Sequence, residues 1–173
     1  YDFIKNFTDA DLKHFPDTAV HRTFNMEDFK YFLKQFQRIY REHNSLEDLF
    51  IVNSGENNFY HAIERFRTVF LNIEHRAHKH VSSPYKNSAS KRIMMYLRWM
   101  VRNDNRGVDF GIWNTISPKH LSIPLDVHTA NISRTLGLLK RKQNDWKAVE
   151  ELDIILRKYN NDDPAIYDYA LFG

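Results

Sequence analysis

The chain has 173 residues, of which 42% are apolar and 14% aromatic, carries a formal net charge of +3 and contains no cysteine. This length suits one domain with a substantial apolar core, and the absence of cysteine excludes disulfides, thiolate zinc sites and cysteine-held iron–sulfur clusters. No apolar run has the length of a membrane span, and no charged-then-apolar leader is visible, so we expect no membrane partner. The lack of cysteine fits a reducing cytoplasm, where we expect the protein to be. Both ends are apolar, and we therefore expect the chain to be a fragment of a longer polypeptide.

Apolar residues recur at helical spacing through the first hundred residues. Asn25 is expected to cap a helix whose apolar face runs from Phe29 to Tyr40. Residues 45–48 resemble a capping box before a short apolar turn at 49–52. A third helical segment covers 59–73, and a fourth is expected to start after Ser88 or Ser90, with Ile93, Met94, Leu97, Met100 and Val101 facing inward.

Apolar residues also recur at helical spacing in the second half of the chain. A fifth helix is expected after Asp126, with an apolar side made of Ile132, Leu136 and Leu139 and with Gly137 near its end. Asn144 is expected to cap a sixth helix that reaches Tyr159, and Asp163-Pro164 to open a seventh. Residues 74–90 and 103–123 are predicted to be non-helical. Because no run alternates well enough to need a sheet, we predict an all-α fold forming a single domain over residues 1–173.

Positive charge is concentrated in one window. Residues 65–106 hold ten Lys or Arg and two acids, a net charge of +8, which leaves −5 for the rest of the chain. Such a patch favours a polyanionic partner, most simply nucleic acid, over a merely solvated basic face. Lys91, Arg98 and Arg102 lie at i, i+7 and i+11, and we expect them to form one basic stripe opposite the apolar face of the fourth helix.

Three histidines in the same window, His75, His78 and His80, do not have the spacing of a zinc site. We expect them to assist polyanion binding, and we predict neither a metal nor a cofactor.

Several stretches carry a family resemblance: "VHRTFNMEDF", "KRIMMYLRWMVR", "IPLDVHT" and "DPAIYDYALFG". Together they resemble an uncharacterised bacterial protein family, which in turn resembles, distantly, the helix-hairpin-helix superfamily of base-excision DNA glycosylases. The narrower likeness rests on Asp126-Val127-His128-Thr129, which is similar to the acid-led start of the helix that carries the glycosylase aspartate.

This resemblance implies a two-lobed helical domain with a central cleft for damaged, double-stranded DNA, into which a base is flipped. It also implies that Lys91 is the nucleophile, by similarity to the archaeal 8-oxoguanine glycosylase arrangement, and that Asp126 supports the developing positive charge. We expect DNA to be bound by Lys86, Arg92, Arg98, Arg102 and His128.

The residues themselves are compatible with these roles. Lys91 is expected in the first turn of a helix, where the helix dipole disfavours a cation, although an ordinary surface lysine fits the same position. Asp126 is expected to cap a helix, which would orient an ionised carboxylate, although most capping aspartates are only structural. The Gly-rich hairpin of the glycosylases is absent before Asp126. Two alternatives therefore stay open: a non-catalytic nucleic-acid-binding module and a helical protein-interaction domain.

Overall fold

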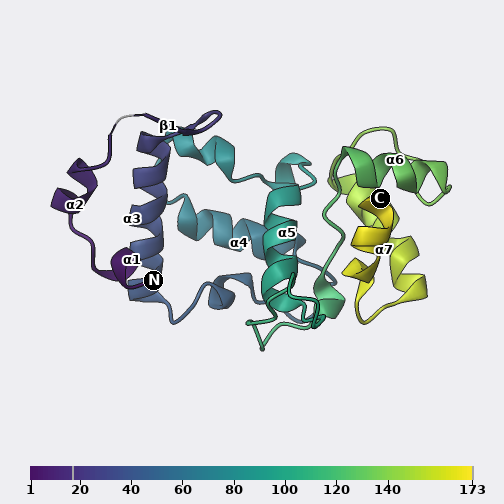
Figure 1. The fold of residues 1–173 in the computed structure, drawn as a ribbon. Helices are drawn as coiled ribbons and strands as arrows, with labels where there is room; N and C mark the ends of the chain where they lie inside the picture. The colour runs from purple at the N-terminus through teal and green to yellow at the C-terminus, as the bar shows by residue number, and fades with distance from the viewer. Residues whose placement is uncertain (17, 173) are drawn as a thin grey trace.

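A computed structural model describes residues 1–16 and 18–172, and it is largely α-helical (Figure 1), as the sequence predicted. The first half contains α1 (Asp2–Asn6), α2 (Asp9–Lys13), α3 (Met26–Glu42) and α4 (Tyr60–Phe70), with 3-10 turns at Glu47–Phe50, Arg76–His80 and Pro84–Lys86. The second half contains α5 (Lys91–Val101), α6 (Val127–Thr135), α7 (Trp146–Tyr159) and α8 (Asp168–Phe172), with 3-10 turns at Pro118–His120 and Pro164–Tyr167.

The prediction that no strand is present was wrong in one place. β1 (Ala19–His21) and β2 (Phe24–Asn25) form a small antiparallel sheet immediately before α3. Strands of three and two residues are too short to show an alternating pattern, and their register shifts between Ala19 and His21.

Side-chain caps fix where the main helices begin. Asn25 caps α3 and Asp126 caps α6, as predicted, and the Asp28 side chain completes a reciprocal capping box with Asn25. The predicted cap of the next helix was wrong by one residue: the Asp145 carboxylate, not Asn144, accepts the Ala148 N–H at the start of α7. Asn144 is used differently, because its side-chain oxygen accepts a hydrogen bond from Arg134.

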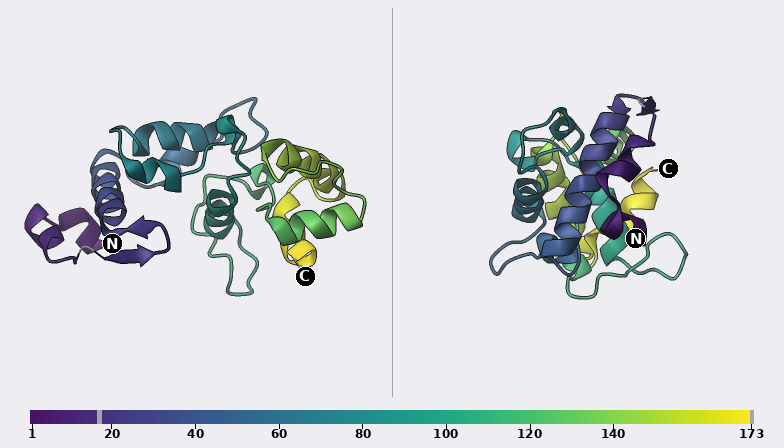
Figure 2. Two further views of the ribbon diagram at one scale, coloured as in Figure 1. Left: turned by 90° about the horizontal axis from the view of Figure 1, so that it is seen from above. Right: turned by 90° about the vertical axis from the view of Figure 1, so that its left-hand side faces the viewer.

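The helices follow one another along an arc, with α5 standing between the N-terminal helices and α6–α8 (Figures 1 and 2). One apolar core runs through the molecule from α3 to α8, and a small second cluster joins Phe7, Leu12 and Leu33 beside α1 and α2. α5 contributes Met94, Leu97 and Val101 to the main core, and it is therefore the central element of the fold.

The buried face of α6 differs from the prediction. Leu136 and Ile132 are exposed, whereas Thr129, Ala130 and Ser133 are buried. α6 packs against α8, and a face of small side chains lets the two helices approach closely. Leu139, beyond Gly137 with its left-handed φ of 72°, does enter the core.

The loop after α5 turns back onto that helix. The backbone N–H groups of Phe110 and Gly111 both donate to the carbonyl oxygen of Trp99. Gly111 has a φ of 55°, and a Cβ there would lie 2.5 Å from the Cβ of Asn103, so only glycine fits this close approach. The turn brings Asp109, which is buried, against the side of α5.

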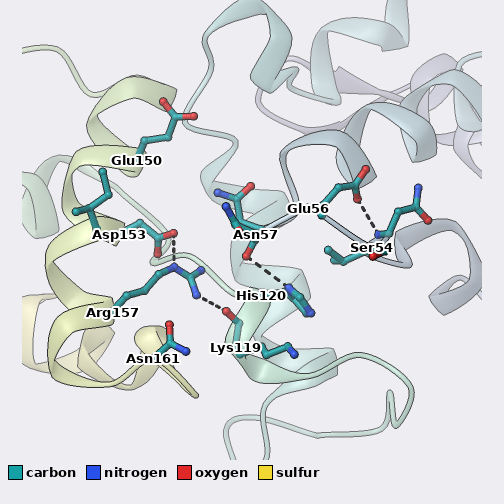
Figure 3. Close-up of a pocket in the computed structure, with 14 residues that line it drawn as sticks. Ser54, Glu56, Asn57, Lys119, His120, Glu150, Asp153, Arg157 and Asn161 are labelled. Atoms are coloured by element: carbon teal, nitrogen blue, oxygen red, sulfur yellow. Dashed lines mark hydrogen bonds and ion pairs between the residues drawn. The ribbon is translucent and has the colours of Figure 1, made fainter.

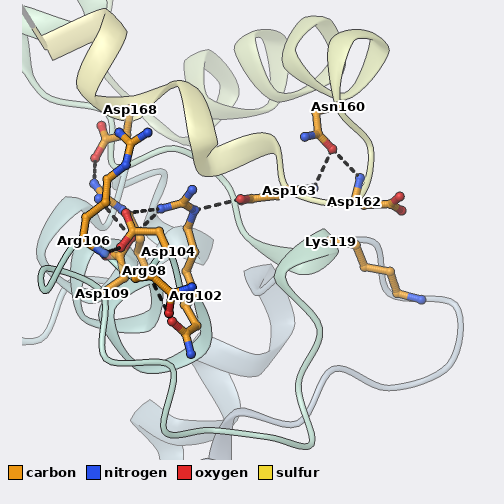
Figure 4. Close-up of polar contacts among 12 residues, drawn as sticks. Arg98, Arg102, Asp104, Arg106, Asp109, Lys119, Asn160, Asp162, Asp163 and Asp168 are labelled. Atoms are coloured by element: carbon orange, nitrogen blue, oxygen red, sulfur yellow. Dashed lines mark hydrogen bonds and ion pairs between the residues drawn. The ribbon is translucent and has the colours of Figure 1, made fainter.

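A buried ion-pair network joins α5 to this loop and to the C-terminal helices (Figure 4). The guanidinium of Arg98, which is 1% exposed, contacts the Asp168 carboxylate, lies 3.2 Å from Asp109 and stands 4.3 Å from the ring centroid of Tyr169. Arg102 lies 2.7 Å from Asp109, 2.8 Å from Asp163 and 3.0 Å from Asp104. The network holds α5 against η5 (Pro164–Tyr167), which Asp163 precedes, and against α8.

Replacing Arg98 by Met should destabilise the protein strongly, because it leaves Asp109 and Asp168 buried with less positive charge. We expect a loss of about 3 to 5 kcal/mol in the free energy of unfolding, measured by urea denaturation. Arg106→Met is the matched control: that side chain is exposed, and its change should stay within about 0.5 kcal/mol. Equal effects of the two substitutions would contradict a structural role for the network.

Candidate functional site

The structure brings Lys91 and Asp126 together, although they are 35 residues apart in the chain. Lys91 is the first residue of α5, Asp126 immediately precedes α6, and the Lys91 Nζ lies 3.0 Å from Asp126 Oδ2. The Lys91 side chain is 46% exposed and the Asp126 side chain 9% exposed. The amine is thus open to a ligand from solvent, while the carboxylate beside it is largely covered.

The Asp126 carboxylate is held in place by two donors. Its Oδ1 accepts the Thr129 N–H at 2.9 Å, as a helix cap, and its Oδ2 accepts from Lys91. Burial by itself raises the pKa of Asp126, but the hydrogen bonds from the Thr129 backbone and from Lys91 outweigh burial and leave the pKa below 3.8. Asp126 is therefore an oriented, ionised carboxylate at neutral pH.

The backbone just before Lys91 is unusual. Ser90, which is buried, has a φ of 47°, and Asn87 has a φ of 61°, in a region that residues other than glycine seldom occupy. Asn87 is tied to the start of α7, since its side chain donates to Asp145 at 2.9 Å and its carbonyl accepts the Trp146 N–H. These contacts fix the turn from which Lys91 projects.

The Lys91–Asp126 pair is also linked electrostatically to the buried network. The pKa of Asp168 is raised, chiefly by burial; Arg98 opposes the rise, and the negative charges of Asp126 and Asp109 add to it. The carboxylates of Asp126 and Asp168 therefore interact electrostatically. Asp126 is paired with Lys91, and Asp168 is paired with Arg98.

The residues predicted to bind nucleic acid divide into two groups. Lys86, Arg92 and His128 are exposed, and the His128 ring packs edge-on against Phe172, with centroids 5.7 Å apart. Arg98 and Arg102 are buried, so the prediction that they form an exposed basic stripe was wrong. The helical pattern placed Arg98 correctly on α5, whereas Arg102 lies just past the end of the helix, as its C-cap with extended backbone. The pattern gave no sign that aspartates from the loop and the C-terminal segments would neutralise both arginines.

Most of the cations in the basic window at residues 65–106 are likewise neutralised by carboxylates. Six of its ten cations contact carboxylates: Arg65, Arg67, Arg76, Lys91, Arg98 and Arg102. Most of the partner acids come from outside the window, so the asymmetry in the sequence is largely balanced in space. Among residues 1–16 and 18–172, the window's cations without an ion pair are Lys79, Lys86, Arg92 and Arg106.

The histidines of the window contact α3 and nearby backbone. His75 stacks on Tyr31 with ring centroids 4.3 Å apart, and His80 Nε2 lies 3.0 Å from Asp28 Oδ2. His78 Nε2 lies 2.8 Å from the Ile73 carbonyl oxygen. Their sequence neighbours gave no indication of these partners, because Asp28 is 52 residues from His80.

A polar pocket of about 740 Å³, which the sequence analysis missed, lies between the loop at 52–58, the turn at 118–120 and α7 (Figure 3). Burial raises the pKa of Asp153 in its wall, and the charge of Arg157, 2.9 Å away, offsets only part of this effect. Burial lowers the pKa of His120. Neither Lys91 nor Asp126 lines this pocket.

The fold therefore defines a largely α-helical protein in which an exposed lysine is paired with a largely covered aspartate. In the described part of the chain no helix is both long and apolar enough to cross a bilayer. The whole chain, residues 1–173, matches the model of a family described as "protein of unknown function (DUF2400)", and it belongs to that family. No curated protein and no solved structure matches the chain.

The Lys91–Asp126 contact predicts a measurable change in titration. In Lys91→Met, the Asp126 pKa should rise, because the variant loses both a hydrogen bond and a nearby positive charge. A carboxyl whose pKa is lowered by folding stabilises the fold above its unfolded pKa, and that contribution is lost as the pH falls through the folded value. The fold of the variant should therefore be less sensitive to acid below about pH 4.

The measurement is a pH titration of the Asp126 side-chain carboxyl by carbon-detected NMR in both proteins. Lys86→Met, which removes an exposed lysine that has no ion pair among the described residues, is the control and should leave the midpoint unchanged. Identical midpoints in the wild type and Lys91→Met would show that the two side chains do not interact in solution.

Proposed function

We propose that this protein binds damaged double-stranded DNA and excises a base, with Lys91 as the nucleophile and Asp126 as its electrostatic partner. The observation that carries the proposal is the 3.0 Å approach of an exposed amine to a largely covered carboxylate from a distant part of the chain. Perturbed, paired ionisable groups of this kind concentrate at functional sites.

The chemistry requires the target nucleotide to be turned out of the duplex, because its C1′ atom is shielded within the stack. Lys91, which forms an ion pair with Asp126, first loses a proton to solvent, and the neutral amine then attacks C1′. The Nζ–C1′ bond forms as the bond from C1′ to the base breaks, and the base leaves with the electron pair. The amine nitrogen then loses a proton to the departing base. The sugar ring opens as the C1′–O4′ bond breaks, O4′ takes the second proton of the nitrogen, and a C1′=Nζ Schiff base remains.

Asp126 stabilises this reaction by its charge. As the glycosidic bond breaks, positive charge develops on the sugar, and an ionised carboxylate fixed by the Thr129 N–H is already oriented toward it. The lowered pKa of Asp126 suits this electrostatic role better than that of a proton acceptor.

DNA would be held by the cations that remain exposed. Lys86 and Arg92 flank Lys91 in the chain, and His128 follows Asp126 by two residues. In this proposal the N-terminal helices α1–α4 and the C-terminal helices α6–α8 act as two lobes, the DNA lies in a cleft between them, and α5 places Lys91 at their junction. Arg98 and Arg102 have no direct part in binding, because both are buried.

A non-catalytic nucleic-acid-binding module is the second candidate. It is favoured by the absence of the Gly-rich hairpin before Asp126, which in the glycosylases offers backbone N–H groups to a phosphate. This candidate uses the same exposed cations and gives Lys91–Asp126 only the task of joining α5 to α6.

Trapping with borohydride distinguishes the two candidates. Incubation with duplexes that carry an abasic site or an oxidised base should give a covalent protein–DNA adduct, which borohydride stabilises and gel electrophoresis detects. Lys91→Met should abolish the adduct, and Asp126→Asn should slow its formation by about 100-fold or more. Lys86→Met should still form it. Absence of any adduct across the substrate panel would make the lysine mechanism wrong.

Salt dependence tests DNA binding separately from chemistry. The affinity for a short duplex should fall with salt, and Lys86→Ala and Arg92→Ala should each reduce the slope of log affinity against log salt concentration by about 1. Asp126→Asn should leave the slope unchanged. Salt-sensitive binding without an adduct would favour the non-catalytic module, whereas binding that ignores salt would contradict both candidates and favour a protein-interaction domain.

A further inference from the structure

A second cavity lies on the other side of α5 and is lined mainly by aromatic and aliphatic side chains. It has a volume of about 300 Å³ and is open to solvent on one side, with walls from α1, α3, α4, α5 and the turns at Glu47–Phe50 and Arg76–His80. The rings that line it include Phe32, Phe36, Phe50, Phe66, Phe70 and Tyr96. Cavities of this size with mostly apolar walls and a few polar groups are typical small-molecule sites.

The aromatic rings in the walls of the cavity pack against one another. Phe32 and Phe36 each contact Phe70, with ring centroids 4.9 and 5.1 Å apart, and Phe50 stacks on Phe66 at 4.6 Å. Phe50 and Phe70 are also among the most completely buried side chains of the core. Rings braced against one another in this way keep the space open, because none can turn inward without losing its own contacts.

The polar groups of the lining favour an anion. Arg92 contributes to the wall, is exposed and forms no ion pair with any residue that the structure describes. Its neighbour Lys91, by contrast, is paired with Asp126. The lining includes no Asp or Glu, and its one histidine, His80, already contacts Asp28. A bound molecule therefore meets one unneutralised positive charge and no negative charge.

Two phenols add hydrogen-bond capacity without charge. Tyr40 and Tyr96 both line the cavity, and burial raises the pKa of each, so both keep their O–H group at neutral pH. A neutral phenol can donate to an anionic oxygen, as the Arg92 guanidinium can.

We propose that this cavity binds a small aromatic molecule that carries a single anionic group, with its rings among the phenylalanines and its anion on Arg92. The apolar body is selected by the aromatic walls, and the charge is selected by an arginine with a free planar face of donors. This inference uses neither Lys91 nor Asp126, and it shares only Arg92 with the proposed DNA-binding surface.

A matched pair of fluorescent probes tests both parts of the proposal. 8-Anilinonaphthalene-1-sulfonate and N-phenyl-1-naphthylamine share the same rings, but only the first carries an anion. Fluorescence titration of the wild type should show saturable binding of one molecule of each probe, with the sulfonate the tighter ligand. Arg92→Gln should weaken binding of the sulfonate by about tenfold and leave the neutral probe unchanged.

Two further variants serve as controls. Lys86→Gln removes an exposed cation that does not line the cavity, and it should leave both affinities unchanged. Ile93→Trp enlarges a partly buried wall residue and should block both probes. If Ile93→Trp alters the circular dichroism spectrum or the melting temperature, Leu46→Phe, at a second partly buried wall residue, replaces it and should have the same effect.

Equal losses of sulfonate binding in Arg92→Gln and Lys86→Gln would overturn the assignment of the anion to Arg92. Unchanged probe binding in both wall variants, while they remain folded, would overturn the assignment of the cavity. Displacement of the sulfonate by a short DNA duplex but not by 2-naphthoate would show that the site belongs to nucleic acid and would overturn the small-molecule proposal.

Discussion

The ion pairs that Arg98 and Arg102 make with Asp109, Asp163 and Asp168 are the constraint on which the arrangement of this protein depends. A guanidinium buried to 1% exposure can exist only with its charge matched, because the cost of an unpaired charge in the interior is several kcal/mol. The network therefore fixes α5 against the C-terminal segments in a way that a purely apolar contact, which tolerates sliding, would not.

This constraint also positions the candidate site. Lys91 is the first residue of α5, the helix that carries Arg98 and that Arg102 follows. Asp126 caps α6, which packs against α8, the helix of Asp168. Anchoring α5 to α8 thus places the two helix starts, and the amine and carboxylate on them, at the observed 3.0 Å. Arg98 and Arg102, which the sequence analysis assigned to DNA binding, instead hold the elements that carry the candidate catalytic groups in position.

α5 has different surroundings on its two sides. On the side of the C-terminal helices, Arg98 of α5 forms an ion pair with Asp168. On the side of α3 and α4, α5 lines the aromatic cavity. Adjacent side chains at its start follow the same division, since Lys91 pairs with Asp126 and Arg92 contributes to the wall of the aromatic cavity. One helix therefore separates two candidate sites that differ in chemistry. Substitution of Lys91 tests the first site and substitution of the wall residue Ile93 tests the second, whereas Arg92 is assigned to both DNA binding and the cavity.

The helical class, the caps at Asn25 and Asp126 and a helix start within a few residues of Lys91 followed from the sequence alone, because helical periodicity and capping depend on residues within a few positions of one another. The sequence did not determine the cap at Asp145, the inner face of α6 or the burial of Arg98 and Arg102. Those features, and the meeting of Lys91 with Asp126, were decided by the tertiary structure. A charge pattern read along a chain cannot show which opposite charges, as many as 70 residues away, folding will bring into contact.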